Sequence, residues 1–131
     1  MVTNTAGTAA RELATQQTHF LRKTLSGVNG NGTFTIGIAP SGAQILRITT
    51  AGRNASGMTG GTATVSFGTA ASVALWFAAN TTPVTTTGIT PVLMIASASA
   101  LLTADTTLVA VIAGTPTGGA VDVIIEYAPN I

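Results

Sequence analysis

The stretch GGAVDVIIEYAP, residues 118–129, determines the class of fold that the sequence predicts. Large apolar side chains occupy every second position in it: Val121, Val123, Ile125 and Tyr127. The positions between them hold Asp122, Ile124 and Glu126. Because side chains alternate between the two faces of a strand, this pattern predicts a β-strand with one buried face and one face toward water.

The same alternation predicts further strands upstream, between turns rich in Gly, Pro and Asn. These strands cover residues 33–38, 44–50, 62–67, 73–78, 92–96 and 107–113. In the first of them, alternation places Phe34, Ile36 and Ile38 on one face. In the second, it places Ile45 on the face opposite Ile48.

The segment 10–25 fits either a helix or a strand. Helical spacing would group Leu13 with Leu21, whereas strand alternation would place Leu21, Lys23 and Leu25 on one face. The threonines of this segment and its position directly before a glycine-rich turn favour a strand.

About eight short strands and no convincing long helix predict an all-β protein. We expect a single antiparallel β-sandwich or a jelly-roll-like barrel, with an extended N-terminal arm. A length of 131 residues fits one such core. Residues 1–25 are expected to form the arm and a possible first strand, and residues 26–131 to form the β-sandwich domain.

Charge is scarce in this chain, which argues against several classes of function. Charged residues make up 7% of the sequence, against about 25% in an average soluble protein. A net charge of +1 provides no basic patch to neutralise phosphates, so we expect no nucleic-acid partner. The longest apolar-rich run, 91–104, is shorter than the roughly 20 residues that span a bilayer, so we expect no membrane partner.

The sequence offers few groups for catalysis or for cofactor binding. It has no cysteine and one histidine, so a catalytic triad would need His19 with Asp105, Asp122 or Glu126. On one strand Asp122 and Glu126 would lie about 13 Å apart, too far for the paired carboxylates of a glycosidase. We therefore predict a protein that is not an enzyme and binds neither cofactor nor metal.

The surface of the domain must consist largely of Thr, Ser, Gly and Ala, because so few charged residues are available. Such a surface tolerates burial, since burying a threonine costs less than burying an unpaired charge. We expect its sides to be covered by copies of the same chain or by a larger partner. The alternative is a monomer that stays soluble through its hydroxyl groups.

Four residues are predicted to bind a partner: Trp76, Phe20, Arg47 and Arg53. Alternation within 73–78 sends Trp76 and Phe77 to opposite faces, so both cannot be core residues of a regular strand. Trp76 is therefore expected to face a neighbouring subunit or another partner. For Arg47 and Arg53 the alternative is a role in solubility at the end of a sheet.

Three segments of the chain resemble small structural proteins of tailed bacteriophage virions. They are GTFTIGIAPSGAQILRITT (32–50), TATVSFGTAAS (62–72) and GGAVDVIIEYAP (118–129). Those proteins often have a strand that ends in a Pro-x-Gly-Ala turn, a strand that ends in Gly-Thr, and a last strand that ends near Glu-Tyr. The resemblance extends over roughly residues 30–129.

The resemblance implies a capsid decoration (cement) protein, an accessory subunit that binds the assembled shell and stabilises it. It also implies a homo-oligomer, with a trimer favoured, and the major capsid protein as partner. The protein would be made in the host cytoplasm and end on the capsid surface of the virion. Two alternatives are open: a tail, neck or fibre component of the virion, and a carbohydrate-binding β-sandwich in which Trp76 stacks on a sugar.

Overall fold

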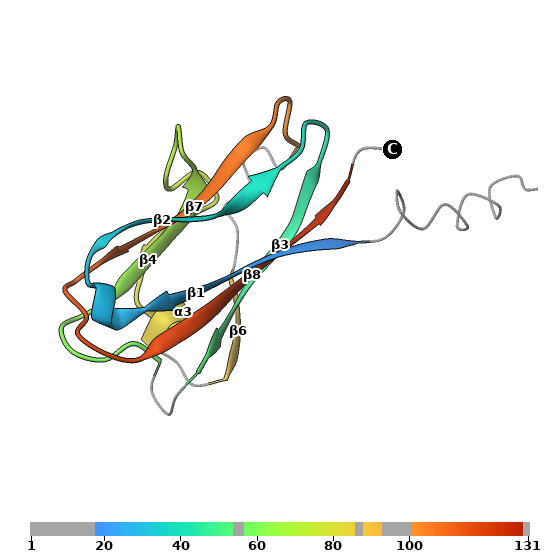
Figure 1. The fold of residues 1–131 in the computed structure, drawn as a ribbon. Helices are drawn as coiled ribbons and strands as arrows, with labels where there is room; N and C mark the ends of the chain where they lie inside the picture. The colour runs from blue at the N-terminus through green and yellow to red at the C-terminus, as the bar shows by residue number, and fades with distance from the viewer. Residues whose placement is uncertain (1–17, 54–56, 86–87, 93–100, 130–131) are drawn as a thin grey trace, which may run out of the picture.

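The structure, a computed structural model, describes residues 18–53, 57–85, 88–92 and 101–129 (Figure 1). These residues form eight β-strands and two short helices. In chain order they are β1 (His19–Ser26), η1 (Gly27–Asn29), β2 (Gly32–Ala39), β3 (Gln44–Gly52), β4 (Thr64–Thr69), β5 (Phe77–Asn80), α3 (Thr82–Thr85), β6 (Ile89–Val92), β7 (Thr106–Ala113) and β8 (Ala120–Ala128). Residues 93–96 of the predicted strand 92–96 lie outside the described residues.

The strands form two four-stranded antiparallel sheets, which we name sheet A and sheet B. Sheet A has the order β1-β8-β3-β6, and sheet B has the order β2-β7-β4-β5. The first strand pairs with the eighth, the second with the seventh, the third with the sixth and the fourth with the fifth. This nested pairing is that of a double-sheet jelly roll. The predicted antiparallel β-sandwich is therefore confirmed, and its described strands form two sheets and no closed barrel.

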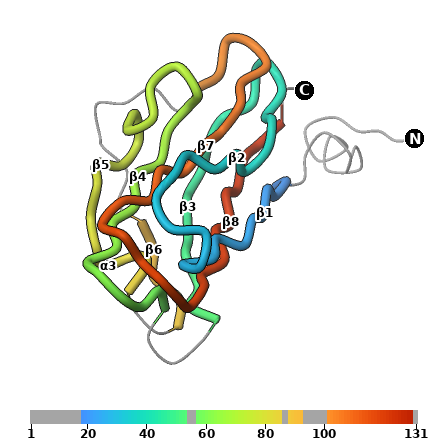
Figure 2. The backbone as a smooth tube through the Cα atoms, turned by 60° about the vertical axis from the view of Figure 1, so that its left-hand side comes forward, coloured from blue at the N-terminus to red at the C-terminus, as the bar shows by residue number. Residues whose placement is uncertain are grey.

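The core lies between the two sheets and is filled by alternate residues of the strands. In β8, Val121, Val123 and Ile125 are at most 1% exposed, as their alternation predicts. The inner residues of β4 and β7 belong to the same hydrophobic cluster: Val65, Phe67, Leu108, Ala110 and Ile112. Figure 2 shows β8 between β1 and β3 in sheet A, so the strand with the clearest sequence pattern is a central one.

A β-bulge in β2 changes which residues of this strand face the core. The pairing of β2 with β7 shifts between Thr35 and Gly37, so Ile36 is buried whereas Ile38 is 63% exposed. The prediction that Phe34, Ile36 and Ile38 share a face is wrong, because one extra residue reverses the alternation beyond the bulge.

A second bulge, in β3, likewise changes which residues of that strand face the core. The pairing of β3 with β8 shifts between Ile45 and Arg47. As a result Ile45 and Ile48 both lie in the core, at 3% and 1% exposed, and Leu46 is 47% exposed. The predicted opposition of Ile45 to Ile48 is wrong for the same physical reason.

The ambiguous N-terminal segment is a strand where the structure describes it. β1 pairs with β8 over all eight of its residues. Leu25 is 2% exposed in the core, and the His19 ring lies 5.6 Å from the ring of Tyr127. Residues 1–17 of the predicted arm lie outside the described residues, and the division of the chain after residue 25 stays a prediction.

The strand predicted over residues 73–78 is displaced toward the C-terminus. β5 begins only at Phe77, and a turn precedes it in which the Leu75 N–H donates to the Ser72 carbonyl at 3.1 Å. The prediction is therefore wrong for residues 73–76, which form a turn and a bend.

Residues 70–76 fold over the outer face of β4. The Ser66 hydroxyl donates a hydrogen bond of 3.2 Å to the Val73 carbonyl. At Gly68 the approach is so close that an added Cβ would stand 2.2 Å from the Ser72 carbonyl oxygen. Only glycine leaves room for this contact, so part of sheet B is covered by its own chain. No helix of the described residues is long and apolar enough to cross a membrane.

Candidate partner-binding face

The outer face of sheet A gathers most of the charged side chains that the structure describes. The register of the strands places Phe20 beside Glu126, and Glu126 beside Arg47. Arg53 follows the end of β3 and reaches the same face, where it contacts Asp122. The structure thus brings together Phe20, Arg47 and Arg53, three of the four residues predicted to bind a partner. Their binding role itself stays a prediction.

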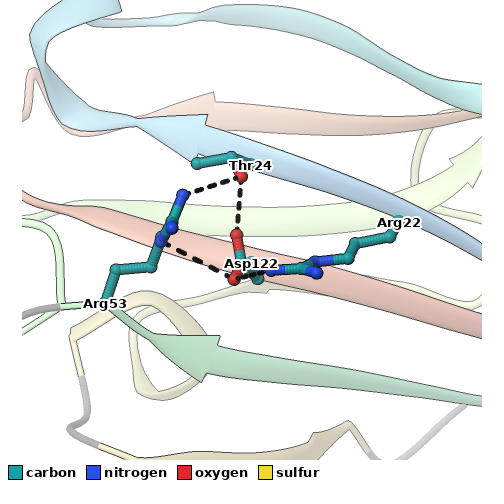
Figure 3. Close-up of polar contacts among 4 residues, drawn as sticks. All are labelled: Arg22, Thr24, Arg53 and Asp122. Carbon is teal, nitrogen blue, oxygen red and sulfur yellow. Dashed lines mark hydrogen bonds and ion pairs between the residues drawn. The ribbon is translucent and has the colours of Figure 1, made fainter.

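Asp122 is the centre of a polar cluster on this face (Figure 3). The Thr24 hydroxyl donates a hydrogen bond of 2.6 Å to one carboxylate oxygen, and the Arg22 guanidinium donates one of 2.9 Å to the other. The Arg53 Nε lies 3.7 Å from the second oxygen, and the Arg53 Nη1 donates to the Thr24 hydroxyl at 3.3 Å. The cluster therefore ties β1, β8 and the loop after β3 together.

The Asp122 carboxylate stays ionised although the residue is only 7% exposed. Burial alone would raise the pKa of this group, because it removes water from the charged form. The hydrogen bonds from Thr24 and Arg22, together with the positive charges of Arg22 and Arg53, outweigh burial and lower the pKa of Asp122 below its ordinary value. One negative charge is thus shared by two guanidinium groups.

A second ion pair on the same face joins Arg47 to Glu126. The Arg47 Nε and Nη2 both donate to the Glu126 carboxylate, the latter at 3.2 Å. The hydrogen bond, and then the charge of Glu126, raise the pKa of Arg47. Because the Arg47 side chain is 69% exposed, water screens this pair and its contribution to stability is small.

Three large apolar side chains are exposed on the same side of the molecule. Phe20 is 61%, Leu46 47% and Ile89 77% exposed. Phe20 lies two residues before Arg22 in β1, on the same strand face, and Ile89 of β6 lies across from Ala51 of β3. Guanidinium groups and exposed apolar side chains on one face are the composition typical of the centre of a protein–protein interface.

Trp76 does not belong to this face, and its predicted position is corrected. Its side chain is 0% exposed and lies in the hydrophobic core. Trp76 precedes β5, so strand alternation does not apply to it, and its backbone N–H donates to the Phe67 carbonyl at 3.0 Å. Phe77 packs against the same core. The carbohydrate-binding alternative thereby loses its aromatic platform, because a buried ring cannot stack on a sugar.

The acidic residues and the histidine considered for catalysis lie in separate places. His19 packs beside Tyr127, and the Asp105 carboxylate accepts a hydrogen bond of 2.8 Å from the Ser41 N–H in the turn between β2 and β3. Within the described part of the chain, no three His, Asp or Glu residues come close enough to hold a metal ion.

An open groove of about 570 Å³ lies near the start of β7, away from the Asp122 cluster. Leu75, Leu101 and Leu102 contribute apolar surface to it, and Asp105 is the one charged group among its described lining residues. A single carboxylate that already accepts a backbone hydrogen bond does not define a ligand, so we assign this groove no role.

Arg22 and Thr24 were not among the residues predicted to bind a partner. The strand interpretation of their segment places Leu21 and Leu25 inward, and therefore Arg22 and Thr24 outward. That signal was available in the sequence. Their pairing with Asp122, which follows Arg22 by 100 residues, could not be read from the sequence, because it depends on the contact between β1 and β8.

The fold defines a structural class of protein. It is the double-sheet jelly roll, which occurs in viral capsid and lectin domains. No protein-family model and no curated protein matches the chain.

Solved structures with a similar fold come from phage capsids. A chain of the cyanophage Pam1 capsid asymmetric unit has a TM-score of 0.61 and 20% identity, over 87% of this chain and 86% of that chain. A chain of the acidic stable capsid structure of Helicobacter pylori bacteriophage KHP30 has a TM-score of 0.61 and 14% identity, over 84% and 86%. A chain of the capsid of Ralstonia phage GP4 has a TM-score of 0.62 and 18% identity, over 87% and 84%. At these identities the likeness is one of fold.

Proposed function

We propose that this chain is a non-enzymatic structural protein of a phage virion, a decoration or cement protein that binds the assembled capsid and stabilises it. The observation that carries the proposal is the jelly-roll fold, which chains of three phage capsid structures share over at least 84% of this chain. The segments that resemble small virion proteins, 32–50, 62–72 and 118–129, support the same function.

The length of the matched chains supports an accessory subunit. The aligned parts make up 87% of this chain and 86% of the Pam1 chain, so the two chains are about equally long. The likeness is therefore to a whole small chain and not to one domain of a much larger shell protein. A unit of this size can be added to a shell that other subunits have already built.

The partners in this proposal are further copies of the chain, arranged as a homotrimer, and the major capsid protein. The scarcity of charge supports covered sides, because Thr, Ser and Ala can be buried at small cost. The four strands of sheet B contain no charged residue. In this account the protein is made in the host cytoplasm and ends on the capsid surface of the virion.

The stabilising effect would follow from mass action. A protein that binds the assembled shell, and not its separate subunits, stabilises the shell by about 2.7 kcal/mol per site when its free concentration is 100 times Kd. Many equivalent sites on one particle multiply this effect. No catalytic step is needed.

Undecorated capsids of the parent phage, mixed with the purified protein, test the proposal. We expect the protein to sediment with the capsids and to raise their melting temperature in scanning calorimetry. If the protein does not bind the capsids and does not shift their melting temperature, the proposal is overturned. Binding to tails or necks alone would establish the alternative of a tail, neck or fibre component.

Light scattering after size-exclusion chromatography should give the mass of three chains. A monomer at micromolar concentration would contradict the trimer.

A further inference from the structure

We infer that the outer face of sheet A, centred on Arg22 and Arg53, binds carboxylate side chains on the surface of a partner protein. The identity of that partner as the assembled shell rests on the function proposed above.

The first observation is an excess of positive charge. Three cationic side chains lie on this face: Arg22, Arg47 and Arg53. The carboxylates that accompany them are Asp122 and Glu126. Glu126 pairs with Arg47, and Asp122 is shared by Arg22 and Arg53. One positive charge is therefore left over for a partner.

The second observation concerns free hydrogen-bond donors. A guanidinium group has five N–H donors in a fixed planar arrangement. Arg22 spends one nitrogen on Asp122, and Arg53 uses Nη1 for Thr24 and turns Nε toward Asp122. Their side chains remain 62% and 52% exposed. Each arginine thus keeps donors directed to water that a carboxylate could accept in a two-point contact.

The third observation is that the two arginines are held in place before any partner arrives. The buried Asp122 carboxylate anchors both guanidinium groups, and Thr24 fixes that carboxylate from β1. Side chains that are already ordered lose less conformational freedom on binding. The Asp122 carboxylate is thus buried against the two guanidinium groups, whose remaining surface is exposed to water.

A protein partner fits this face better than a nucleic acid. Nucleic-acid binding relies on several phosphate contacts, for example about 6–10, whereas this face has only one charge in excess. Phe20 and Ile89, exposed by 61% and 77%, supply apolar surface that a protein can cover and that a phosphate backbone cannot. The described face therefore fits an acidic protein surface with apolar groups beside its carboxylates.

The test compares three forms of the full chain in binding to undecorated capsids, by co-sedimentation over a range of salt concentrations. They are the wild type, the triple variant Arg22→Gln/Arg53→Gln/Asp122→Asn, and the control Thr33→Gln/Thr35→Gln on sheet B. The triple variant removes the buried charge together with its partners, so it leaves no unpaired carboxylate, and thermal unfolding verifies its fold. The control introduces the same side chain at two exposed positions of β2.

We expect the triple variant to bind at least about tenfold more weakly than wild type, the size of effect expected for hot-spot side chains. We also expect salt to weaken wild-type binding more than that of the triple variant. The control should stay within about twofold of wild type. Equal affinity of the triple variant and wild type would overturn the inference and leave the proposed function standing.

A second arm uses no capsid and separates failure of the inference from failure of the proposed function. Poly-L-glutamate is titrated into isotope-labelled protein, with a single-stranded DNA of 20 nucleotides as comparison, and NMR shifts are followed. Shifts confined to β1, β8 and β3, and lost in the triple variant, support the inference even where capsids do not bind. No shift with poly-L-glutamate, or tighter binding of DNA, would overturn it.

Discussion

The outer faces of the two sheets have different chemistry. The strands of sheet A carry Arg22, Lys23, Arg47, Asp122 and Glu126, whereas the strands of sheet B carry no charged residue. The outer face of sheet B is partly covered by residues 70–76 of its own chain, which contact it at Ser66 and Gly68. The outer face of sheet A has arginine side chains that are more than half exposed.

This difference indicates a division of roles. On sheet B, the outward positions Ser66 and Gly68 of β4 are covered by the chain itself, so substitutions there are expected to lower stability. On sheet A, outward positions hold groups that can exchange water for a partner, so substitutions there are expected to change binding more than folding. Three substitutions test this division, beginning with the largest expected effect on stability.

Trp76→Ala should have the largest effect on the free energy of unfolding. Trp76 is 0% exposed in the hydrophobic core, and its removal leaves a cavity, so we expect a loss of about 3–5 kcal/mol in urea unfolding. The matched change on sheet A, Phe20→Ala, removes an aromatic ring that is 61% exposed and should cost less than about 0.5 kcal/mol. Equal losses for the two variants would show that the division is wrong.

Gly68→Ala should have the next largest effect. The added methyl group would stand 2.2 Å from the Ser72 carbonyl oxygen, so the segment over sheet B must move, at a cost of about 2–3 kcal/mol. Gly32→Ala is the control, because its methyl group would meet only the end of the Phe34 ring, at 3.3 Å. If Gly68→Ala is tolerated as well as Gly32→Ala, residues 70–76 do not cover sheet B as described.

Asp122→Asn should have the smallest effect, and that effect should depend on pH. Loss of the charged hydrogen bonds is expected to cost about 1.5 kcal/mol at pH 7. The fold lowers the pKa of Asp122 from its ordinary value of 3.8. Its stabilisation is therefore complete above that value and is lost as the pH falls through the lower pKa of the folded protein.

Urea unfolding of wild type and Asp122→Asn at pH 7, 5 and 3 measures this dependence. The difference between the two proteins should be similar at pH 7 and 5 and smaller at pH 3. A difference that does not change with pH would mean that the ionised carboxylate does not hold the two arginines.

Much of the fold could be predicted from the sequence, because alternation reports which side of a strand is buried. Val121, Val123 and Ile125 are buried as predicted. The faces of Ile38 and Ile48 were mispredicted because a bulge inserts one residue without a clear signal in the sequence. Trp76 was misplaced because alternation was applied to a turn that only resembles a strand in composition.

The candidate site was predictable only in part. Phe20, Arg47 and Arg53 were selected from the sequence, and the structure places them on one face. The Asp122 cluster depends on β1 lying beside β8, a contact between opposite ends of the chain. Local patterns describe the faces of a strand but not its neighbours in a sheet, so no local pattern could reveal this cluster.

Electron cryomicroscopy of undecorated capsids after addition of the purified chain tests the central claim most directly. The map must separate neighbouring strands, which lie about 4.7–4.9 Å apart. We predict jelly-roll density on the outside of the shell, in groups of three, with the Arg22 and Arg53 side of sheet A against the capsid surface. Density on the tail alone, or no added density on the particle, would contradict the claim that this chain decorates the capsid.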